Sequence, residues 1–254
     1  MKTLALINET KNIKEVLAEA IKYNGDVLEV LFVHEEEFFD LPDLFKPEFE
    51  QDENIDKSAI KKEILSTLNE LKKYQENAAI FVYINDTYSR VESLVKDNDT
   101  LIVTKYNSAT EELLDSKYKV LFLKDTKHDY QEVLVELALD GEDTQRIDFA
   151  KELFPNSNLT LIYDYNHFVT VNMYVVDPMM GLDNDPYLDE VLENENKKTF
   201  NQILKDTGLD GVFLEDAGEE DNLILYINNK TNLAILKQRD SDIMEKVIKD
   251  CLVI

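Results

Sequence analysis

The sequence predicts an α/β protein made of two similar doubly wound domains, each built on a parallel sheet. Short apolar runs alternate with segments whose apolar residues recur at helical spacing, which is typical of parallel strands joined by right-handed crossovers. The apolar runs are nearly continuous, as expected for strands covered on both faces. The same order of elements starts again near Glu132. These three observations favour a tandem fold with pseudo-twofold symmetry.

The first half begins with a buried strand and a helix whose apolar face holds Ile13, Val16 and Leu17. Asn24-Gly25 is a plausible stop for that helix. An irregular acidic stretch at 35–56 then precedes the remaining elements. The expected strands are 3–7, 27–33, 78–84, 101–104 and 118–123, and the expected helices are 13–21, 60–71 and 91–95, with at most a helical stub at 109–114.

The second half repeats this order after a boundary between residues 126 and 127, which gives domains 1–126 and 127–254. A long segment at 166–188 takes the place of the acidic stretch. The expected strands are 132–139, 159–163, 212–214, 223–227 and 251–254, and the expected helices are 147–154, 191–204 and 242–250.

The composition excludes several classes of protein. Of the 254 residues, 44% are hydrophobic, which is enough for a sizeable core, and 53 acidic against 27 basic residues give a net charge of −26. Such a surface repels phosphate backbones and anionic lipids, so we expect neither nucleic-acid nor membrane binding. Cys251 is the one cysteine, which rules out an internal disulfide. The N-terminal apolar run is too short for a signal peptide, so a cytoplasmic protein is expected.

No pattern for catalysis or metal binding is found. The sequence lacks HExxH and a Walker-type loop, and its three histidines follow no Ser-His-Asp order. Asp140-Gly141-Glu142-Asp143 does not fit an EF-hand loop and is interpreted as a turn followed by a helix cap. We therefore expect no catalytic residue and no metal site.

Two stretches resemble the universal stress protein family in its tandem two-domain form. VLVELALDGEDTQRIDFAKELFPNSNLTLIYDYN is similar to that family's opening strand, Asp-containing turn, first helix and second strand. NLILYINNKTNLAILKQRDSDIMEKVIKDCLVI is similar to its fourth strand, loop, last helix and last strand. The resemblance implies an adenine nucleotide alpha hydrolase-like fold and a stress-associated role.

The same resemblance indicates a degenerate nucleotide site. Nucleotide-binding members carry Gly-x2-Gly-x9-Gly-Ser/Thr after the fourth strand, where glycines let the backbone approach phosphates. The matching positions here are Asn228, Thr231, Ser241 and Asp242, without any glycine. The family's Asp after the first strand is matched by Asp140. In the first half, Asn8 takes the place of this family Asp, and the loop is deleted. The second half is expected to lack the helix between its third and fourth strands. No cofactor is therefore expected, with ATP as the alternative.

Partner surfaces form a separate set of predictions. The resemblance implies that the last strands of the two domains pair with each other, which gives a monomeric pseudo-dimer or, through the inserts, a homodimer. The interface residues would be Lys119, Val120, Leu121, Phe122, Leu252 and Val253. The acidic-aromatic stretch is typical of segments that dock on protein partners, although it could instead fold over its own domain. Its docking residues would be Phe38, Phe39, Leu41, Phe45 and Phe49.

The preferred function is that of a non-enzymatic, stress-associated protein that has lost the usual mode of ATP binding and acts through protein partners. The alternative is a nucleotide-binding switch or weak ATPase that uses an altered pocket in the second domain. A third possibility is a carrier of a small ligand or a lipid head group that uses the Met-rich segment 169–182, which could equally be a hairpin or a dimer contact.

Overall fold

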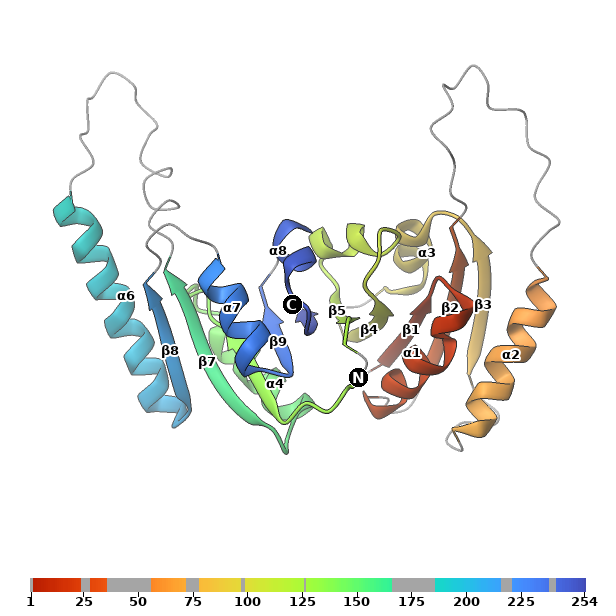
Figure 1. Cartoon of the computed structure of the whole chain (residues 1–254), viewed down its shortest axis with the longest axis horizontal. Helices are drawn as coiled ribbons and strands as arrows, with labels where there is room; N and C mark the ends of the chain where they lie inside the picture. Colours follow the sequence, from red (N-terminus) through yellow and green to blue (C-terminus); the bar gives the residue numbers. More distant parts are fainter. Residues whose placement is uncertain are drawn as a thin grey trace, which may run out of the picture. The chain divides into compact units, whose positions relative to one another are not determined.

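A computed structural model describes residues 2–23, 28–35, 56–71, 78–96, 99–125, 127–165, 186–215, 221–237 and 241–254. The chain divides into two compact units, Met1–Lys124 and Asp125–Ile254. The sequence predicted the boundary between residues 126 and 127. Figure 1 labels the helices and strands of both units.

The first unit alternates strands and helices in the predicted order. Its strands are β1 (Lys2–Ile7), β2 (Leu28–His34), β3 (Ala79–Ile84), β4 (Thr100–Lys105) and β5 (Lys119–Leu123). Its helices are α1 (Ile13–Ala20), α2 (Lys57–Glu70) and α3 (Thr87–Leu94), with 3₁₀ turns η1 (Thr10–Asn12), η2 (Ile21–Tyr23) and η4 (Glu111–Asp115).

The strands of this unit lie in the order β3-β2-β1-β4-β5, and every neighbouring pair is parallel. Helix α1 packs on β1 and β4, and α2 packs on β3 (Figure 1). The apolar runs that predicted the strands supply the core, in which Leu4, Val30 and Ile102 are fully buried. Burial on both faces of the sheet explains why these strands read as continuous apolar runs.

The second unit repeats this succession. Its strands are β6 (Glu132–Glu136), β7 (Asn158–Tyr165), β8 (Asp210–Glu215), β9 (Leu233–Leu236) and β10 (Asp250–Val253). Its helices are α4 (Asp143–Leu153), α6 (Pro186–Thr207), α7 (Asp221–Lys230) and α8 (Ser241–Lys246). The strand order β8-β7-β6-β9-β10 is again parallel and matches that of the first unit. The predicted α/β class with parallel sheets is thus confirmed.

One predicted element was wrong. The run LILYI at 223–227 was expected to be the fourth strand of the second half, but it lies inside helix α7, and the fourth strand is β9. Leu223 and Ile227 are buried while Leu225 is 56% exposed, which is the pattern of a helix that packs on one face. A short apolar run does not distinguish a strand from a buried helix. The second unit therefore has a helix between its third and fourth strands, contrary to the prediction.

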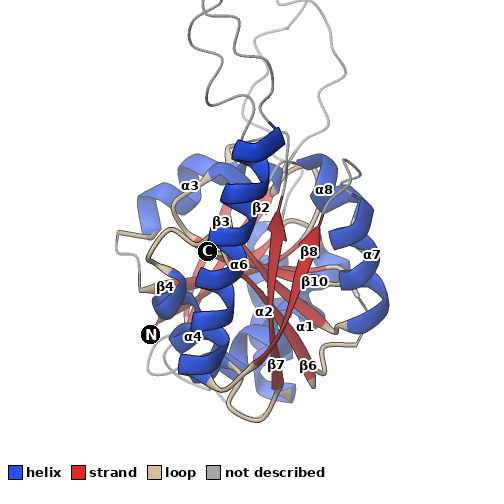
Figure 2. Ribbon diagram, turned by 90° about the vertical axis from the view of Figure 1, so that its left-hand side faces the viewer, coloured by secondary structure: helices blue, strands red, loops and turns tan. Residues whose placement is uncertain are grey.

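Gly211 fixes how closely α6 approaches β8. Helix α6 packs against β7 and β8 (Figure 2). A Cβ atom at Gly211 would lie 2.5 Å from Cδ2 of Leu204 and 2.8 Å from Cζ of Phe200, both on α6. We expect Gly211→Ala to lower the free energy of unfolding by about 1–2 kcal/mol, because these side chains must leave their packed positions. Urea unfolding tests this, and an unchanged midpoint would show that the two side chains rearrange freely.

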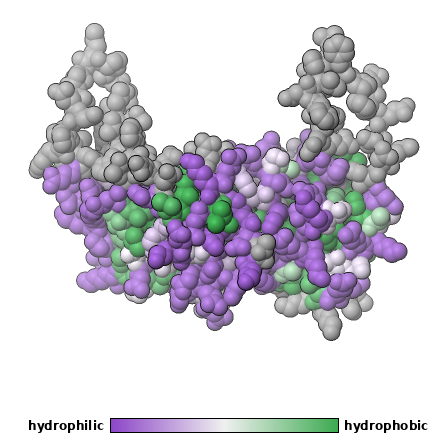
Figure 3. Space-filling model, viewed as in Figure 1, coloured by the Kyte–Doolittle hydropathy of each residue, from purple (hydrophilic) through white to green (hydrophobic). Residues whose placement is uncertain are grey.

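The visible surface is mostly hydrophilic, in keeping with the acidic composition (Figure 3). Large apolar side chains that are exposed include Leu65, Leu225 and Ile248. None of the helices within the described ranges combines the length and apolar character needed to cross a bilayer.

Candidate functional site

The carboxyl ends of the central strands are the places to search for a site in each unit. In doubly wound sheets, ligands bind outside the carboxyl ends of the strands, where the strand order reverses direction. This point lies between β1 and β4 in the first unit and between β6 and β9 in the second.

In the second unit, the turn after β6 holds a closed cluster of charges. Arg146 donates from Nη1 to Oδ1 of Asp140 at 3.1 Å and from Nη2 to Oδ2 at 2.9 Å. Its Nη1 also donates to Oδ1 of Asp143 at 3.0 Å, and that oxygen accepts from the backbone N–H of Ala138 at 2.9 Å. Leu139 has a left-handed φ of 54°, which marks a tight turn. These hydrogen bonds from Arg146 lower the pKa of Asp140 below its ordinary range.

A ligand that binds Asp140, as the sequence predicted, would therefore compete with Arg146 for the carboxylate oxygens. Both carboxylate oxygens of Asp140 already accept from the guanidinium, so a ligand donor would share these oxygens with Arg146. A bidentate arginine–carboxylate pair is among the stronger polar contacts in proteins. The arrangement is that of a structural brace for the start of α4.

Asn228 and Thr231 do not lie in a loop after the fourth strand, as the sequence comparison had placed them. Asn228 belongs to α7, and Thr231 directly follows that helix, before β9. Asn228 Nδ2 donates to the Lys246 carbonyl at 3.1 Å, and its Oδ1 accepts from the Ile248 N–H at 2.9 Å. Thr231 Oγ1 donates to the Ile227 carbonyl at 2.9 Å. Both side chains satisfy backbone groups, so this placement was wrong because the fourth strand had been misassigned.

Ser241 and Asp242 begin α8, and their side chains lie outside the described part of the chain. The strand that precedes them is β9, so the connection between strand and helix runs only from Lys237 to Asp240. Lys237, which sequence reasoning missed, donates its N–H to Oε2 of the buried Glu136 at 3.3 Å, and its Nζ lies 3.8 Å from Oε1. Burial lowers the pKa of Lys237.

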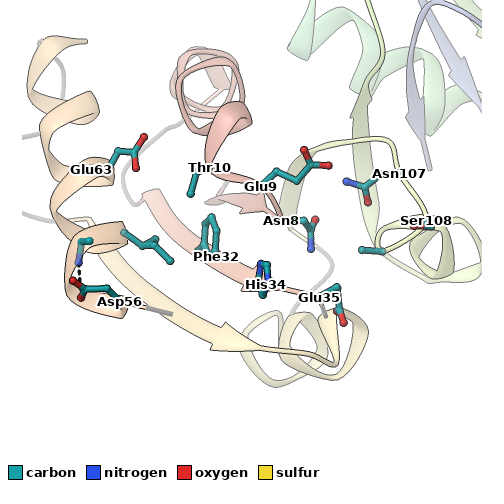
Figure 4. Close-up of a pocket in the computed structure, with 13 residues that line it drawn as sticks. Asn8, Glu9, Thr10, Phe32, His34, Glu35, Asp56, Glu63, Asn107 and Ser108 are labelled. Carbon is teal, nitrogen blue, oxygen red and sulfur yellow. Dashed lines mark hydrogen bonds between the residues drawn. The ribbon is translucent and has the colours of Figure 1, made fainter. Parts of the chain in front are cut away.

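In the first unit, a pocket of about 730 Å³ opens at the carboxyl ends of β1 and β2 (Figure 4). Asn8 and Glu9 come from the end of β1, Phe32 and His34 from β2, and Asp56 from the start of α2. The described residues that line it are Asn8, Glu9, Thr10, Phe32, His34, Glu35, Asp56, Ala59, Ile60, Glu63, Asn107, Ser108 and Ala109. Of these residues, the sequence had singled out only Asn8, since the others approach one another through the fold.

Two carboxylates of this pocket occupy helix N-termini. Glu35 Oε1 accepts from the backbone N–H of Thr87, the first residue of α3, at 2.8 Å and also from the Thr87 hydroxyl. Asp56 Oδ1 accepts from the N–H groups of Ser58 and Ala59 at 2.9 and 3.0 Å. A helix N-terminus favours an anion. In this chain, the carboxylates of Asp56 and Glu35 supply that anion at the N-termini of α2 and α3.

The residues predicted to form the domain interface lie on the last strand of each unit. Lys119, Val120, Leu121 and Phe122 lie on β5, and Leu252 and Val253 lie on β10. Their pairing with one another stays a prediction, because the units are described separately. Phe38, Phe39, Leu41, Phe45 and Phe49 lie outside the described residues, as does the segment 169–182. Across the described ranges, no group of three or more His, Cys, Asp or Glu side chains is arranged to hold a metal ion.

Comparison with solved structures identifies the fold. A putative universal stress protein from Pseudomonas aeruginosa UCBPP-PA14 aligns with a TM-score of 0.60 over 100% of this chain and 92% of its own, at 14% identity. A universal stress protein from Archaeoglobus fulgidus DSM 4304 aligns with a TM-score of 0.56 over 99% and 95%, at 15% identity. This chain has a universal-stress-protein-like fold.

A solved structure with a different description is also similar to this chain. The cytoplasmic domain of a prokaryotic cation chloride cotransporter aligns with a TM-score of 0.52 over 99% of this chain and 94% of its own, at 9% identity. Neither a protein-family model nor a curated protein sequence matches the chain. The likeness at this identity concerns the fold alone, so function must be argued from the sites.

Proposed function

We propose that this universal-stress-protein-like chain is a non-enzymatic, stress-associated protein that does not hold ATP by the usual phosphate loop and acts through protein partners. The observation that carries the proposal is the length of the connection between β9 and α8. Only Lys237–Asp240 lie between them, and none of these residues is glycine. The Gly-x2-Gly-x9-Gly motif of nucleotide-binding members needs more than a dozen residues at this place.

The electrostatics of both units support the same proposal. In the first unit, four carboxylates line the pocket, and two of them occupy the N-termini of α2 and α3. In the second, Arg146 is engaged by Asp140 and Asp143. A triphosphate would meet carboxylates in the first unit and a neutralised cation in the second, and both situations disfavour binding.

One observation favours the alternative of a nucleotide switch or weak ATPase in the second unit. Lys237 and Arg146 are close enough for their charges to interact at the carboxyl ends of β9 and β6. A phosphate group could in principle draw these two cations away from their carboxylate partners. The experiment must therefore test ATP binding directly.

We expect the purified chain to carry no nucleotide and to show no saturable binding of Mg-ATP by calorimetry. Native mass spectrometry before and after addition of Mg-ATP provides the readout. Asp140→Ala, which frees Arg146 from its bidentate partner, serves as the comparison. An adduct with the mass of a nucleotide that is present in the wild type and lost in Asp140→Ala would contradict the proposal and favour the switch.

A further inference from the structure

Asn8 carries a buried hydrogen-bond acceptor that has no donor among the described residues. Its side chain points into the first unit's pocket (Figure 4), and the residue is only 8% exposed. Nδ2 donates to the Val33 carbonyl at 3.1 Å and to Oγ1 of Thr87 at 3.0 Å, and Oδ1 is left without a partner. A carbonyl only accepts, so Val33 fixes which end of the amide is the nitrogen. A buried acceptor without a donor is costly, which points to a ligand that donates.

The charge of the pocket selects among such donors. Glu9, Glu35, Asp56 and Glu63 line it, and among the described lining residues His34 is the only basic one. Glu9 is paired with Lys11, and Asp56 caps α2. Both hydrogen bonds from Thr87 go to Oε1 of Glu35, so within the described residues its Oε2 keeps capacity to accept. A cationic N–H donor satisfies both the amide oxygen and the carboxylates.

The distribution of these groups indicates an elongated ligand. Glu63 and Asp56 approach from α2, whereas Asn8, Glu9 and Glu35 lie at the ends of β1 and β2 (Figure 4). Phe32 lies between the two acidic sets (Figure 4), and Ala59 and Ile60 on α2 add to the apolar lining. The volume of about 730 Å³ suits a small organic molecule rather than a single metal ion.

We propose that this pocket binds a linear aliphatic polyamine. One ammonium group donates to Asn8 Oδ1 and Glu35, another meets Glu63, and the methylene chain between them covers Phe32 and Ile60. The net charge of −26 draws a polycation toward the molecule and speeds its encounter with the pocket. This inference concerns a ligand of the first unit and stands independently of the partner function proposed above.

Calorimetric titration of the full chain with spermidine at fixed ionic strength tests the proposal. We expect saturable one-to-one binding, with n-butylamine much weaker because it carries a single charge. Mg²⁺ at the same charge concentration should not displace spermidine. A separate titration with ATP tests the earlier proposal, so the failure of one can be told from the failure of the other.

Matched variants locate the site. Glu35→Gln removes the charge but keeps an oxygen for the Thr87 donors, and it should weaken binding about tenfold. Glu63→Gln on α2 should weaken it about threefold. Glu70→Gln makes the same change on the same helix outside the pocket lining, and it should leave affinity unchanged.

Three results would overturn the proposal. The first is the absence of saturable spermidine binding by the wild type. The second is an equal loss in Glu63→Gln and Glu70→Gln, which would show general attraction to an acidic surface. The third is displacement by Mg²⁺ at equal charge. Glu63 and Glu70 are both exposed, so these two variants fold even if Glu35→Gln does not.

Discussion

Replacing Asp250 with alanine should destabilise the second unit by about 3 kcal/mol or more. Asp250 begins β10 and is fully buried. Its Oδ1 accepts from the N–H of Asp125 at 2.8 Å, and its Oδ2 accepts from Tyr130 Oη at 2.8 Å and from His128 Nδ1 at 2.6 Å. This carboxylate therefore ties the segment before β6 to the last strand.

The expected size of the effect comes from what the substitution leaves behind. Alanine removes every one of these acceptor bonds. It leaves the buried Tyr130 hydroxyl and the half-buried donors of Asp125 and His128 without this partner, which costs more than the bonds themselves contribute. Tyr130→Phe deletes only one donor and should cost about 1 kcal/mol. Asp148→Ala, at an exposed position of α4, should stay within about 0.5 kcal/mol of the wild type.

Urea unfolding of the three variants provides the measurement. If Asp250→Ala and Asp148→Ala lose the same amount of stability, the buried carboxylate would be no more important than a surface one. The interpretation of Asp250 as the anchor of β10 would then be wrong.

Replacing Arg146 with methionine should cost about 2 kcal/mol at neutral pH. The Arg146 side chain is 12% exposed and pairs with Asp143, whose side chain is 5% exposed. Removal of the cation leaves that carboxylate buried with only the Ala138 N–H and the start of α4 to stabilise it. The loss of stability is reduced because the Asp140 side chain, which also pairs with Arg146, is 42% exposed and its ion pair is weakened by solvent. Lys151→Met, an exposed change of the same kind on α4, should have little effect.

The loss caused by Arg146→Met should also depend on pH. Because Arg146 holds the pKa of Asp140 below its ordinary value of about 3.9, Asp140 stabilises the folded chain above that value. The contribution disappears as the pH falls through the lowered pKa of the folded state. The difference in stability between wild type and Arg146→Met should therefore be constant above about pH 5 and shrink below about pH 4. Urea unfolding at pH 7, 5 and 3 checks this, and a difference that grows in acid would refute it.

The sequence predicted most elements because apolar runs and helical periodicity survive into the fold. TLALI and LEVLFV become β1 and β2, and the apolar face of Ile13, Val16 and Leu17 becomes the buried face of α1. The failure at LILYI has a physical reason. The run LILYI satisfies a strand as well as a helix, and the burial of Leu223, Ile224 and Ile227 together with the exposure of Leu225 reveals a helix.

The candidate site was predictable only in part. Asn8 stood out by its place after the first strand, whereas Glu35, Glu63 and Thr87 carried no signal in a chain with 53 acidic residues. Asp140 was noticed for the same reason as Asn8, but its partner Arg146 was not. Arg146 reaches back to Asp140 across the turn before α4, in which Gly141 has a φ of 89°.

The sequence by itself therefore determined the α/β class, the parallel strands and the repeated order of elements, since these depend on local periodicity. The tertiary structure decided which polar groups meet. It brought Thr87 to Glu35 across 52 residues and Asp250 to His128 across 122. It also left Asn8 Oδ1 without a donor from the part of the chain that the structure describes. Such contacts depend on where strands end and loops return, and local pattern carries no information about distances between residues far apart in the chain.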